Sequence, residues 1–581
     1  VQADSVQAAL ADRRVAGRGR HAVRGGVGSG GDRLRLQRMT DGCAFVDHLD
    51  PGVFEIGQHR NRVVAGGFNS LHSTIDNNLH DRGIIRGVDR WQEGNIYAER
   101  LVGHITATRD FVRQIEAIGQ LKRIAVEVDP VLEMTEIADR VMKSPDGGKA
   151  LLFTNVVGSR MPVLINQFGS WKRLQMALGG RHPDELASRI SELIELQPPQ
   201  GLVEKVKALG KLKELASFSA KTVREAPCQE VWLAKPDLDL VPILHCWPDD
   251  GGPFITLPLV FSHDPRTGSR NCGMYRIQKV DSTTALMHWQ IHKDGAAHLR
   301  DSDGRVPVAV AIGTDPITTY AASAPLPPGI DEMMLAGFMR GRPVEMVKCR
   351  TNDVEVPANA EIVLEGYVDA TDLRDEGPFG DHTGFYTPVD KYPTFHLTGM
   401  SMRRDAVYST TIVGKPPMED YYLGKATERI FLPLIKTSLP DILDMNMPVE
   451  GVFHNCVIVS IRKRYPGHAK KVMNAIWGLG LLSLSRLVVV VDEDVDVQNL
   501  SQVAFYAFSN VDVGRDMLVT EGPVDALDHA APYFALGSKV GFDATRKWEG
   551  EGIVRPWPAE ATMSDEVRAR VSARWAEFGI R

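Results

Sequence analysis

The chain has 581 residues, 43% of them hydrophobic and 24% charged, and its formal charge at pH 7 is −7. These values are ordinary for a globular protein and exclude a wholly disordered, collagen-like or coiled-coil chain. The acidic balance argues against a nucleic-acid partner, and no apolar run approaches the roughly 18 residues of a membrane span. None of the six cysteines forms a CxxC pair, so we expect a reducing cytoplasm rather than a zinc ribbon or a disulfide framework.

Residues 1–107 differ in composition from the rest of the chain. They contain 14 Arg and no Lys, and the first lysine is Lys122. No period of 2 or 3.6 residues is sustained there, and the basic start and apolar run of a signal peptide are missing. We therefore predict a disordered N-terminal extension over residues 1–107.

Helical and extended patterns alternate from Thr108, which we expect to cap a helix that ends at Gly119. The expected elements that follow are a strand over 124–128, a helix over 134–142, strands over 151–156 and 162–165, and a helix over 170–178. This alternation predicts an N-terminal α/β domain over residues 108–225, which ends in a helical connector from residue 193.

The pattern changes at about residue 226. Short β-rich runs separated by Gly, Pro, Asp and Asn continue to residue 429, which predicts a mainly antiparallel barrel or sandwich. Alternation of strands and helices returns over 430–560 and predicts a second α/β domain, and an amphipathic helix is expected within 561–581. The predicted fold class is therefore α/β plus β.

Two segments of the middle block could bind a ligand. Asn271 and Arg276 are five residues apart, so a regular strand would place them on opposite faces, and a bulge or bend would be needed to bring them together. Arg suits recognition of a carboxylate or phosphate, although the segment also fits a surface strand. His288 and His292 have i, i+4 spacing and could ligate a metal, or one could be buried and the other solvated.

Two further segments carry carboxylates. Glu345 lies in an alternating apolar strand and could be an ordinary exposed residue. Glu376-Gly-Pro-Phe-Gly-Asp381-His382 places two carboxylates around a Gly-Pro turn, and such pairs can separate one another's pKa values into an acid and a base. Turns favour Asp and Gly for structural reasons as well, so both interpretations stay open.

Together these segments resemble the UbiD family, decarboxylases that use prenylated FMN. The resemblance rests on Asn271-x-x-x-Tyr275-Arg276, His292, Glu345-Met-Val-Lys-Cys and the Glu376–His382 segment, in that order. Residues 465–470 and 537–545 look like the family's C-terminal domain, and the similarity runs from about Thr108 to Pro558. Within the family the chain is most similar to the decarboxylases of 3-polyprenyl-4-hydroxybenzoate. The resemblance implies a middle domain like the split β-barrel of flavin reductases, with the site between it and a flanking domain.

The resemblance also implies a ligand set. Asn271, His292 and Glu345 would hold Mn²⁺ against the cofactor phosphate, with K⁺ beside it. The residues expected to contact prenylated FMN are Met274, Tyr275, Arg276, His288, Trp289, Gln290, Lys293 and Asp294. The chain departs from the family where His288 replaces Arg and where Lys293-Asp294-Gly295 replaces Arg-Gly-Gly. Both departures lower the positive charge that would face a phosphate.

By the same resemblance, Arg276, Glu376 and Asp381 form the catalytic set. Arg276 would orient the substrate carboxylate and link to Glu376, and Asp381 would protonate the carbon after CO₂ leaves. Decarboxylation of an aromatic or vinylic acid leaves a poorly stabilised carbanion, for which the modified flavin supplies an electron sink. Asp381 must then carry a proton, and we expect burial and the neighbouring Glu376 to raise its pKa.

Three functions follow as hypotheses. The first is decarboxylation of 4-hydroxy-3-polyprenylbenzoate to a 2-polyprenylphenol in ubiquinone biosynthesis. The second is the reaction of another aromatic or α,β-unsaturated acid, in either direction. The third is a non-catalytic flavin-binding protein, which the presence of the whole catalytic set disfavours. The expected partners are an aromatic acid, a flavin prenyltransferase that supplies the cofactor, and further copies in a homodimer or homohexamer. A polyprenyl tail would add peripheral contact with the inner face of the cell membrane to a cytoplasmic location.

Overall fold

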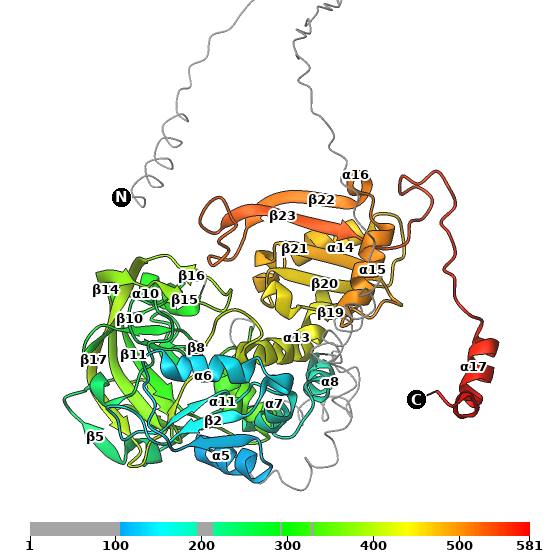
Figure 1. The fold of residues 1–581 in the computed structure, drawn as a ribbon. Coiled ribbons are helices and arrows are strands. Elements are labelled where there is room, and N and C mark those ends of the chain that lie inside the picture. The colour runs from blue at the N-terminus through cyan, green and yellow to red at the C-terminus, as the bar shows by residue number, and fades with distance from the viewer. Residues whose placement is uncertain (1–104, 195–212, 291–292, 327–329, 581) are drawn as a thin grey trace, which may run out of the picture. The chain divides into compact units, whose positions relative to one another are not determined.

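The computed structural model describes residues 105–194, 213–290, 293–326 and 330–580 (Figure 1). These residues belong to one compact unit, Ser70–Arg581. The extension expected over 1–107, apart from its last three residues, lies outside the described residues, as does part of the connector expected from residue 193.

The N-terminal part is built on a four-stranded sheet of order β1-β2-β3-β18. Its strands are β1 (Leu121–Ile124), β2 (Ala150–Phe153), β3 (Val163–Ile165) and β18 (Tyr408–Ser409), and its helices are α5 (Thr108–Ala117), α6 (Glu133–Met142), α7 (Trp171–Ala177) and α8 (Pro183–Ile194). The strand expected over 124–128 is wrong in position, because Leu121 is the buried residue of β1 whereas Val126 is 69% exposed.

A nine-stranded sheet of antiparallel pairings forms the centre, in the order β6-β9-β10-β17-β14-β11-β7-β8 with β5 added at β17. Its strands are β5 (Val231–Leu233), β6 (Phe254–Ile255), β7 (Leu259–His263), β8 (Arg270–Met274), β9 (Ile277–Lys279), β10 (Thr284–Met287), β11 (Arg305–Ile312), β14 (Ile362–Glu376) and β17 (Asp390–Met402). The pairing of β14 with β17 shifts register twice, after Glu365 and after Asp369, and such irregularities bend a sheet. The sheet curls into a half-barrel (Figure 1), which confirms the predicted architecture.

Both faces of the central sheet are buried. Val308 and Val310 of β11 pack into one apolar cluster, whereas the alternate residues Ala309 and Ala311 pack into another. The elements around the sheet are α10 (Asp294–Asp301), α11 (Pro316–Ala321), α12 (Glu332–Arg340), a small sheet of β4 (Lys221–Val223), β12 (Glu345–Lys348) and β13 (Glu355–Pro357), and the pair β15 (Phe379–Gly380) and β16 (Tyr386–Thr387).

The C-terminal α/β part follows the long helix α13 (Glu419–Ser438), which runs through the domain boundary expected at residue 429. Its five-stranded sheet has the order β19-β20-β21-β23-β22. The strands are β19 (Ile442–Asn446), β20 (Cys456–Ile461), β21 (Leu487–Asp492), β22 (Met517–Pro523) and β23 (Leu536–Asp543), and the helices are α14 (His468–Ile476), α15 (Leu500–Asn510) and α16 (Val513–Asp516).

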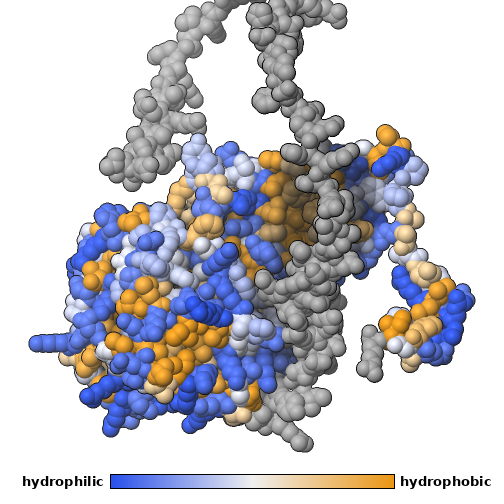
Figure 2. Space-filling view, in the orientation of Figure 1, coloured by the Kyte–Doolittle hydropathy of each residue, from blue (hydrophilic) through white to orange (hydrophobic). Residues whose placement is uncertain are grey.

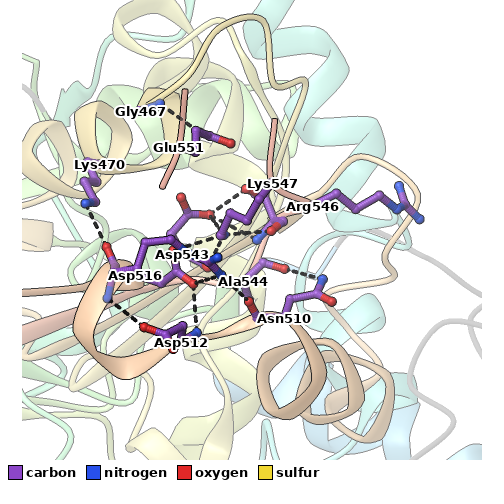
Figure 3. Close-up of polar contacts among 12 residues, drawn as sticks. Gly467, Lys470, Asn510, Asp512, Asp516, Asp543, Ala544, Arg546, Lys547 and Glu551 are labelled. Carbon is purple, nitrogen blue, oxygen red and sulfur yellow. Dashed lines mark hydrogen bonds and ion pairs between the residues drawn. The ribbon is translucent and has the colours of Figure 1, made fainter. Parts of the chain in front are cut away.

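A buried lysine lies at one end of this sheet. The ammonium group of Lys547 donates to the carbonyl oxygens of Asp543 and Thr545, at 2.7 Å each. It also pairs with the carboxylates of Asp543 at 2.9 Å and Asp516 at 3.5 Å (Figure 3). Since its side chain is fully buried, these oxygens replace the water that a charged amine would otherwise keep.

The chain ends in the helix α17 (Asp565–Ala573), which has no buried residue. Apolar residues gather on this segment (Figure 2), and Trp575, Phe578 and Ile580 are each about half exposed or more. Among the helices of the described part, none has the length and apolar character needed to cross a membrane.

Candidate active site

Arg276 lies at a break between two strands of the central sheet. Strand β8 ends at Met274 and β9 begins at Ile277, so Tyr275 and Arg276 leave the regular alternation of a strand. This break is the bend that the sequence required if Asn271 and Arg276 were to serve one site. The Arg276 side chain is only 9% exposed.

Two carboxylates hold the Arg276 guanidinium. Nε donates to Oε1 of Glu376 at 2.8 Å and Nη2 donates to Oε2 at 2.9 Å, and Nη1 donates to Oδ2 of Asp381. Nη2 also donates to Oγ1 of Thr387 at 3.2 Å, and the guanidinium lies 4.6 Å from the centre of the Phe379 ring. The structure therefore brings together the three residues that the sequence predicts as the catalytic set.

The Gly-Pro turn places the two carboxylates. Glu376 is the last residue of β14, and Gly377 adopts a φ of +92°, a conformation that favours glycine. The Gly377 N–H donates to Oε1 of Gln278 at 2.8 Å, and the Gly380 N–H donates to Oδ1 of Asp250 at 2.7 Å. These bonds fix the turn, and Asp381 then returns toward Arg276.

His288 also belongs to this cluster, through Glu376. Its Nδ1 lies 3.3 Å from Oε2 of Glu376, and its ring stacks on Tyr392 with centroids 4.2 Å apart. Burial and the neighbouring Arg276 lower the pKa of His288, so the imidazole is neutral at pH 7. The family's arginine at this position would add a cation, whereas His288 adds none.

Both carboxylates of the cluster are ionised. Burial alone would raise their pKa values, but hydrogen bonds from His288 and Arg276 outweigh it and lower the pKa of Glu376 to about 2. His382 and Arg276 likewise hold the pKa of Asp381 well below its usual range, against the effect of burial. The expectation that burial and Glu376 raise the pKa of Asp381 is therefore wrong, because the cations next to Asp381 dominate.

The network continues from Asp381 to two histidines. The backbone N–H of His382 and its Nδ1 both lie 2.7 Å from Oδ1 of Asp381. Nε2 of His382 lies 2.8 Å from Nε2 of His454, which precedes strand β20.

A second group of predicted residues lies around the start of α10. Trp289 is buried, and its ring lies edge-on to Tyr275 with centroids 6.4 Å apart. Among the described residues, the indole N–H of Trp289 has no hydrogen-bond partner, and Lys293 precedes α10 without capping it through its side chain. A buried orphan donor beside an uncapped helix N-terminus fits the phosphate of a flavin nucleotide. Asp294 in the first turn opposes that charge.

The remaining cofactor positions are Met274, at the end of β8, and Gln290, which follows Trp289, and both are partly exposed. Of the predicted metal ligands, Asn271 is buried on β8, with its Nδ2 3.5 Å from Oη of Tyr275. Glu345 begins β12 and is exposed. His292 lies outside the described residues, in which no group of three His, Cys, Asp or Glu could hold a metal ion. Asn271 and Glu345 offer the oxygen atoms that a hard cation prefers, so the donor chemistry fits Mn²⁺.

Several residues of the cluster have no signal in the sequence. Tyr392 lies in the long strand β17 and Thr387 in β16, and neither position differs in pattern from an ordinary strand residue. His454 comes from a turn more than 70 residues after Asp381. Among these additional cluster residues, only His382 has a sequence signal, because it directly follows Asp381.

A buried guanidinium paired with two carboxylates on a curled sheet is a site that can bind an acidic group. Three family models match the chain, all described as domains of 3-octaprenyl-4-hydroxybenzoate carboxy-lyase. They are the N-terminal domain over residues 112–194, the Rift-related domain over 221–416 and the C-terminal domain over 421–544. These matches cover more than half of the chain, so the chain belongs to the UbiD family of decarboxylases.

Individual relatives agree with this assignment. An uncharacterized protein of Archaeoglobus fulgidus is 50% identical over 475 residues, which cover 81% of this chain and 98% of the relative. Vanillic acid decarboxylase of Sedimentibacter hydroxybenzoicus in its closed form has 25% identity and a TM-score of 0.71, and the match covers 81% of this chain and 98% of that one. The UbiD-class enzyme HmfF of Pelotomaculum thermopropionicum has 26% identity and a TM-score of 0.64, over 78% of this chain and 97% of that one. HmfF was solved with FMN and, in an evolved dimeric form, with prFMN.

Proposed function

We propose that this protein decarboxylates an aromatic acid with the aid of prenylated FMN. The observation that carries the proposal is the buried Arg276, held by Glu376 on one side and Asp381 on the other above the Phe379 ring. The buried guanidinium can attract a substrate carboxylate, and the neighbouring Phe379 ring can pack against a flat aromatic substrate.

Arg276 orients the acid. Its hydrogen bonds to the described residues use four of the five N–H groups of a guanidinium, which leaves one Nη1–H for a substrate carboxylate. Glu376 fixes the plane of the guanidinium through two bonds. Asp381, on the Nη1 side of Arg276, delivers a proton to the carbon from which CO₂ departs. His288, neutral and stacked on Tyr392, adds no positive charge beside Arg276.

Prenylated FMN, when bound, supplies the electron sink that the departing CO₂ requires. The residues that would hold it are Met274, Tyr275, Arg276, His288, Trp289, Gln290, Lys293 and Asp294. The free indole N–H of Trp289 and the start of α10 would receive its phosphate. Asn271, His292 and Glu345 would hold Mn²⁺ at that phosphate, with K⁺ beside it.

The first substrate to test is 4-hydroxy-3-polyprenylbenzoate, which would become a 2-polyprenylphenol on the route to ubiquinone. This choice rests on the family models and on the resemblance of the motifs. A second candidate is a small hydroxybenzoate without a tail, favoured by the similarity to vanillic acid decarboxylase. Both substrates present the same carboxylate to Arg276.

The proposal includes partners. A flavin prenyltransferase would supply the cofactor in the cytoplasm, and a polyprenyl tail would bring the enzyme to the inner face of the membrane. The C-terminal segment supports assembly into a homodimer or homohexamer, because an isolated helix as short as α17 is marginal in water and its apolar side chains are exposed. A second copy of the chain would cover them.

The test is to co-express the protein with a flavin prenyltransferase, purify it with Mn²⁺ and K⁺, and identify the released cofactor by mass. CO₂ release is then measured from a 3-prenyl-4-hydroxybenzoate and from vanillic acid. Prenylated FMN with CO₂ release supports the proposal, and the preferred acid selects between the two candidates. A protein that binds prenylated FMN and releases no CO₂ from either acid would contradict it.

A further inference from the structure

We propose that His382 stores the proton that the decarboxylation consumes, that Asp381 passes this proton to the substrate carbon, and that His454 keeps His382 in its charged form. This inference rests on the proposed decarboxylase function. His382 and His454 act through Asp381 and touch no substrate, so they are positioning residues.

The contacts of Asp381 divide between its two oxygen atoms. Oδ2 accepts from Arg276, the residue expected to meet the substrate. Oδ1 accepts from the backbone N–H of His382 and faces Nδ1 of the same residue at 2.7 Å. Asp381 therefore lies between Arg276 and the imidazole of His382. A carboxylate in this position can accept a proton from the imidazole and pass it to the substrate.

His382 is fixed on its other side as well. Its ring stacks on Phe453 with centroids 5.3 Å apart, and its Nε2 lies 2.8 Å from Nε2 of His454. Two ring nitrogens at that distance share one proton, so one of them donates and the other accepts. His382 therefore has a hydrogen-bond partner at each nitrogen, as an imidazolium requires.

The charges around the pair decide which ring carries the extra proton. Asp381, Asp420 of α13 and Asp525 after β22 raise the pKa of His382, although burial lowers it. Burial and the neighbouring His382 lower the pKa of His454 to about 4. His382 is consequently the imidazolium, with Nδ1–H toward Asp381 and Nε2–H donated to the neutral ring of His454.

The proton balance is simple. As CO₂ leaves, the Nδ1–H proton of His382 moves to Oδ1 of Asp381, and the carboxyl O–H proton of Asp381 moves to the substrate carbon. The C–C bond breaks, a C–H bond forms, Asp381 is again a carboxylate, and His382 is left neutral with its Nε2–H bond to His454 intact. After product release, Asp381 takes up one proton from the solvent and returns it to Nδ1 of His382, so that each turnover consumes one solvent proton. This route explains how a carboxylate with a strongly lowered pKa can still deliver a proton.

The first experiment reads the charge of His382 without substrate or cofactor. Protein with ¹³C-labelled histidine is titrated by NMR, and the His382 signal is assigned by its loss in His382→Gln. We expect His382 to titrate above the ordinary value of about 6.5. In His454→Leu, which removes the acceptor for Nε2–H, the midpoint falls by about half to one pH unit, and His454→Gln restores it because its amide oxygen accepts the same bond. A wild-type midpoint at or below the ordinary value overturns the proposal.

The second experiment measures kcat and KM against pH in the prenylated-FMN enzyme. Wild-type kcat falls as the pH rises through the raised pKa of His382, because the stored proton is then lost. His382→Gln lowers kcat by about 100-fold or more and abolishes this pH dependence, with KM, bound cofactor and Tm unchanged.

His396→Gln, on β17 outside the cluster, serves as the control. A kcat of His382→Gln within twofold of wild type, with the same pH dependence, overturns the proposal. A wild-type enzyme inactive on every acid counts against the proposed function instead, and the NMR titration still tests His382.

Discussion

Arg276 and Glu376 are joined by two parallel hydrogen bonds, from Nε to Oε1 at 2.8 Å and from Nη2 to Oε2 at 2.9 Å. The Glu376 carboxylate is fully buried, so neither partner can rotate away without leaving a charge unpaired. Arg276 is therefore held in one orientation before any substrate arrives, and its Nη1 edge is the part left to recognise an acid. Such preorganisation reduces the reorganisation required during the reaction.

Substitutions of the three clustered residues should each abolish turnover. We expect Arg276→Ala, Glu376→Gln and Asp381→Asn to lower kcat/KM by about 100-fold or more, because they remove the carboxylate anchor, its support and the proton conduit respectively. CO₂ release measures the loss, and the circular dichroism spectrum checks the fold. Asp372→Asn, a partly exposed carboxylate of the same strand that lies outside the cluster and pairs with Arg374, is the matched control. Activity of Asp381→Asn close to wild type would remove it from the proton path.

Gly295→Ala should weaken flavin binding. A Cβ atom at Gly295 would lie 2.5 Å from the indole nitrogen of Trp289, so the indole must move away from the start of α10. We expect a lower ratio of bound flavin to protein, measured by absorbance after gel filtration. Gly478→Ala is the control, since its Cβ would meet only carbonyl oxygens at 3.6 Å. Full flavin occupancy in Gly295→Ala would place the phosphate elsewhere.

Removal of the proposed metal ligands should reduce metal content. Asn271→Ala and Glu345→Ala each delete one oxygen ligand, and we expect purified protein to lose most of its Mn²⁺ as measured by inductively coupled plasma mass spectrometry. Chelation of wild-type protein should release cofactor as well. Asp353→Asn, an exposed carboxylate that pairs with Lys348 of β12, is the control. Unchanged Mn²⁺ in Glu345→Ala would exclude that ligand.

Stability should fall as the pH rises from about 4.5 to 7 through the titration of Glu419. Burial raises the pKa of this carboxyl to about 7, although it accepts bonds from the Phe168 N–H and the Thr411 hydroxyl. A raised carboxyl pKa means that the unfolded chain loses its proton first, so the contribution to stability is present at low pH and disappears as the pH rises. Thermal unfolding across this range should show a smaller slope in Glu419→Gln than in wild type. An equal slope would mean that Glu419 is ionised in the folded protein.

Lys547→Met should destabilise the C-terminal part by about 3–5 kcal/mol, because it leaves the buried Asp543 carboxylate without its cation, whereas Asp516 keeps its pair with Arg515. Chemical unfolding followed by tryptophan fluorescence measures the change. Arg568→Met, which affects an exposed pair with Asp565 at 3.7 Å, should change stability by no more than about 0.5 kcal/mol. Similar values for the two variants would show that the buried amine contributes no more than a surface charge.

Local patterns predicted the architecture well where burial alternates with the period of the element. The central β-rich block and the flanking α/β parts follow from such patterns, as in β11, where alternate residues enter two different clusters. The strand expected over residues 124–128 was misplaced because Val126 is apolar and yet exposed. Apolar character alone does not reveal which side of a short strand is covered.

The residues of the candidate site also differ in whether the sequence could predict them. Arg276, Glu376 and Asp381 could be predicted because the two separate segments that carry them, 271–276 and 376–382, resemble those of a known family. The charge state of Asp381 was not accessible, because it depends on the His382 ring turning back onto its neighbour and on Arg276 reaching across from another strand turn. Tyr392 and His454 enter the network only through the tertiary fold, so no local pattern could indicate them.

The two carboxylates that pair with Arg276 also affect substrate binding and product release. A substrate acid must displace Asp381 from Nη1 or share that edge with it, whereas the decarboxylated product has no carboxylate with which to compete. Asp381 can return to the guanidinium as soon as CO₂ and the decarboxylated aromatic product separate from it. The cluster thus favours release of the product over its retention, and simple anions such as acetate should be weak inhibitors.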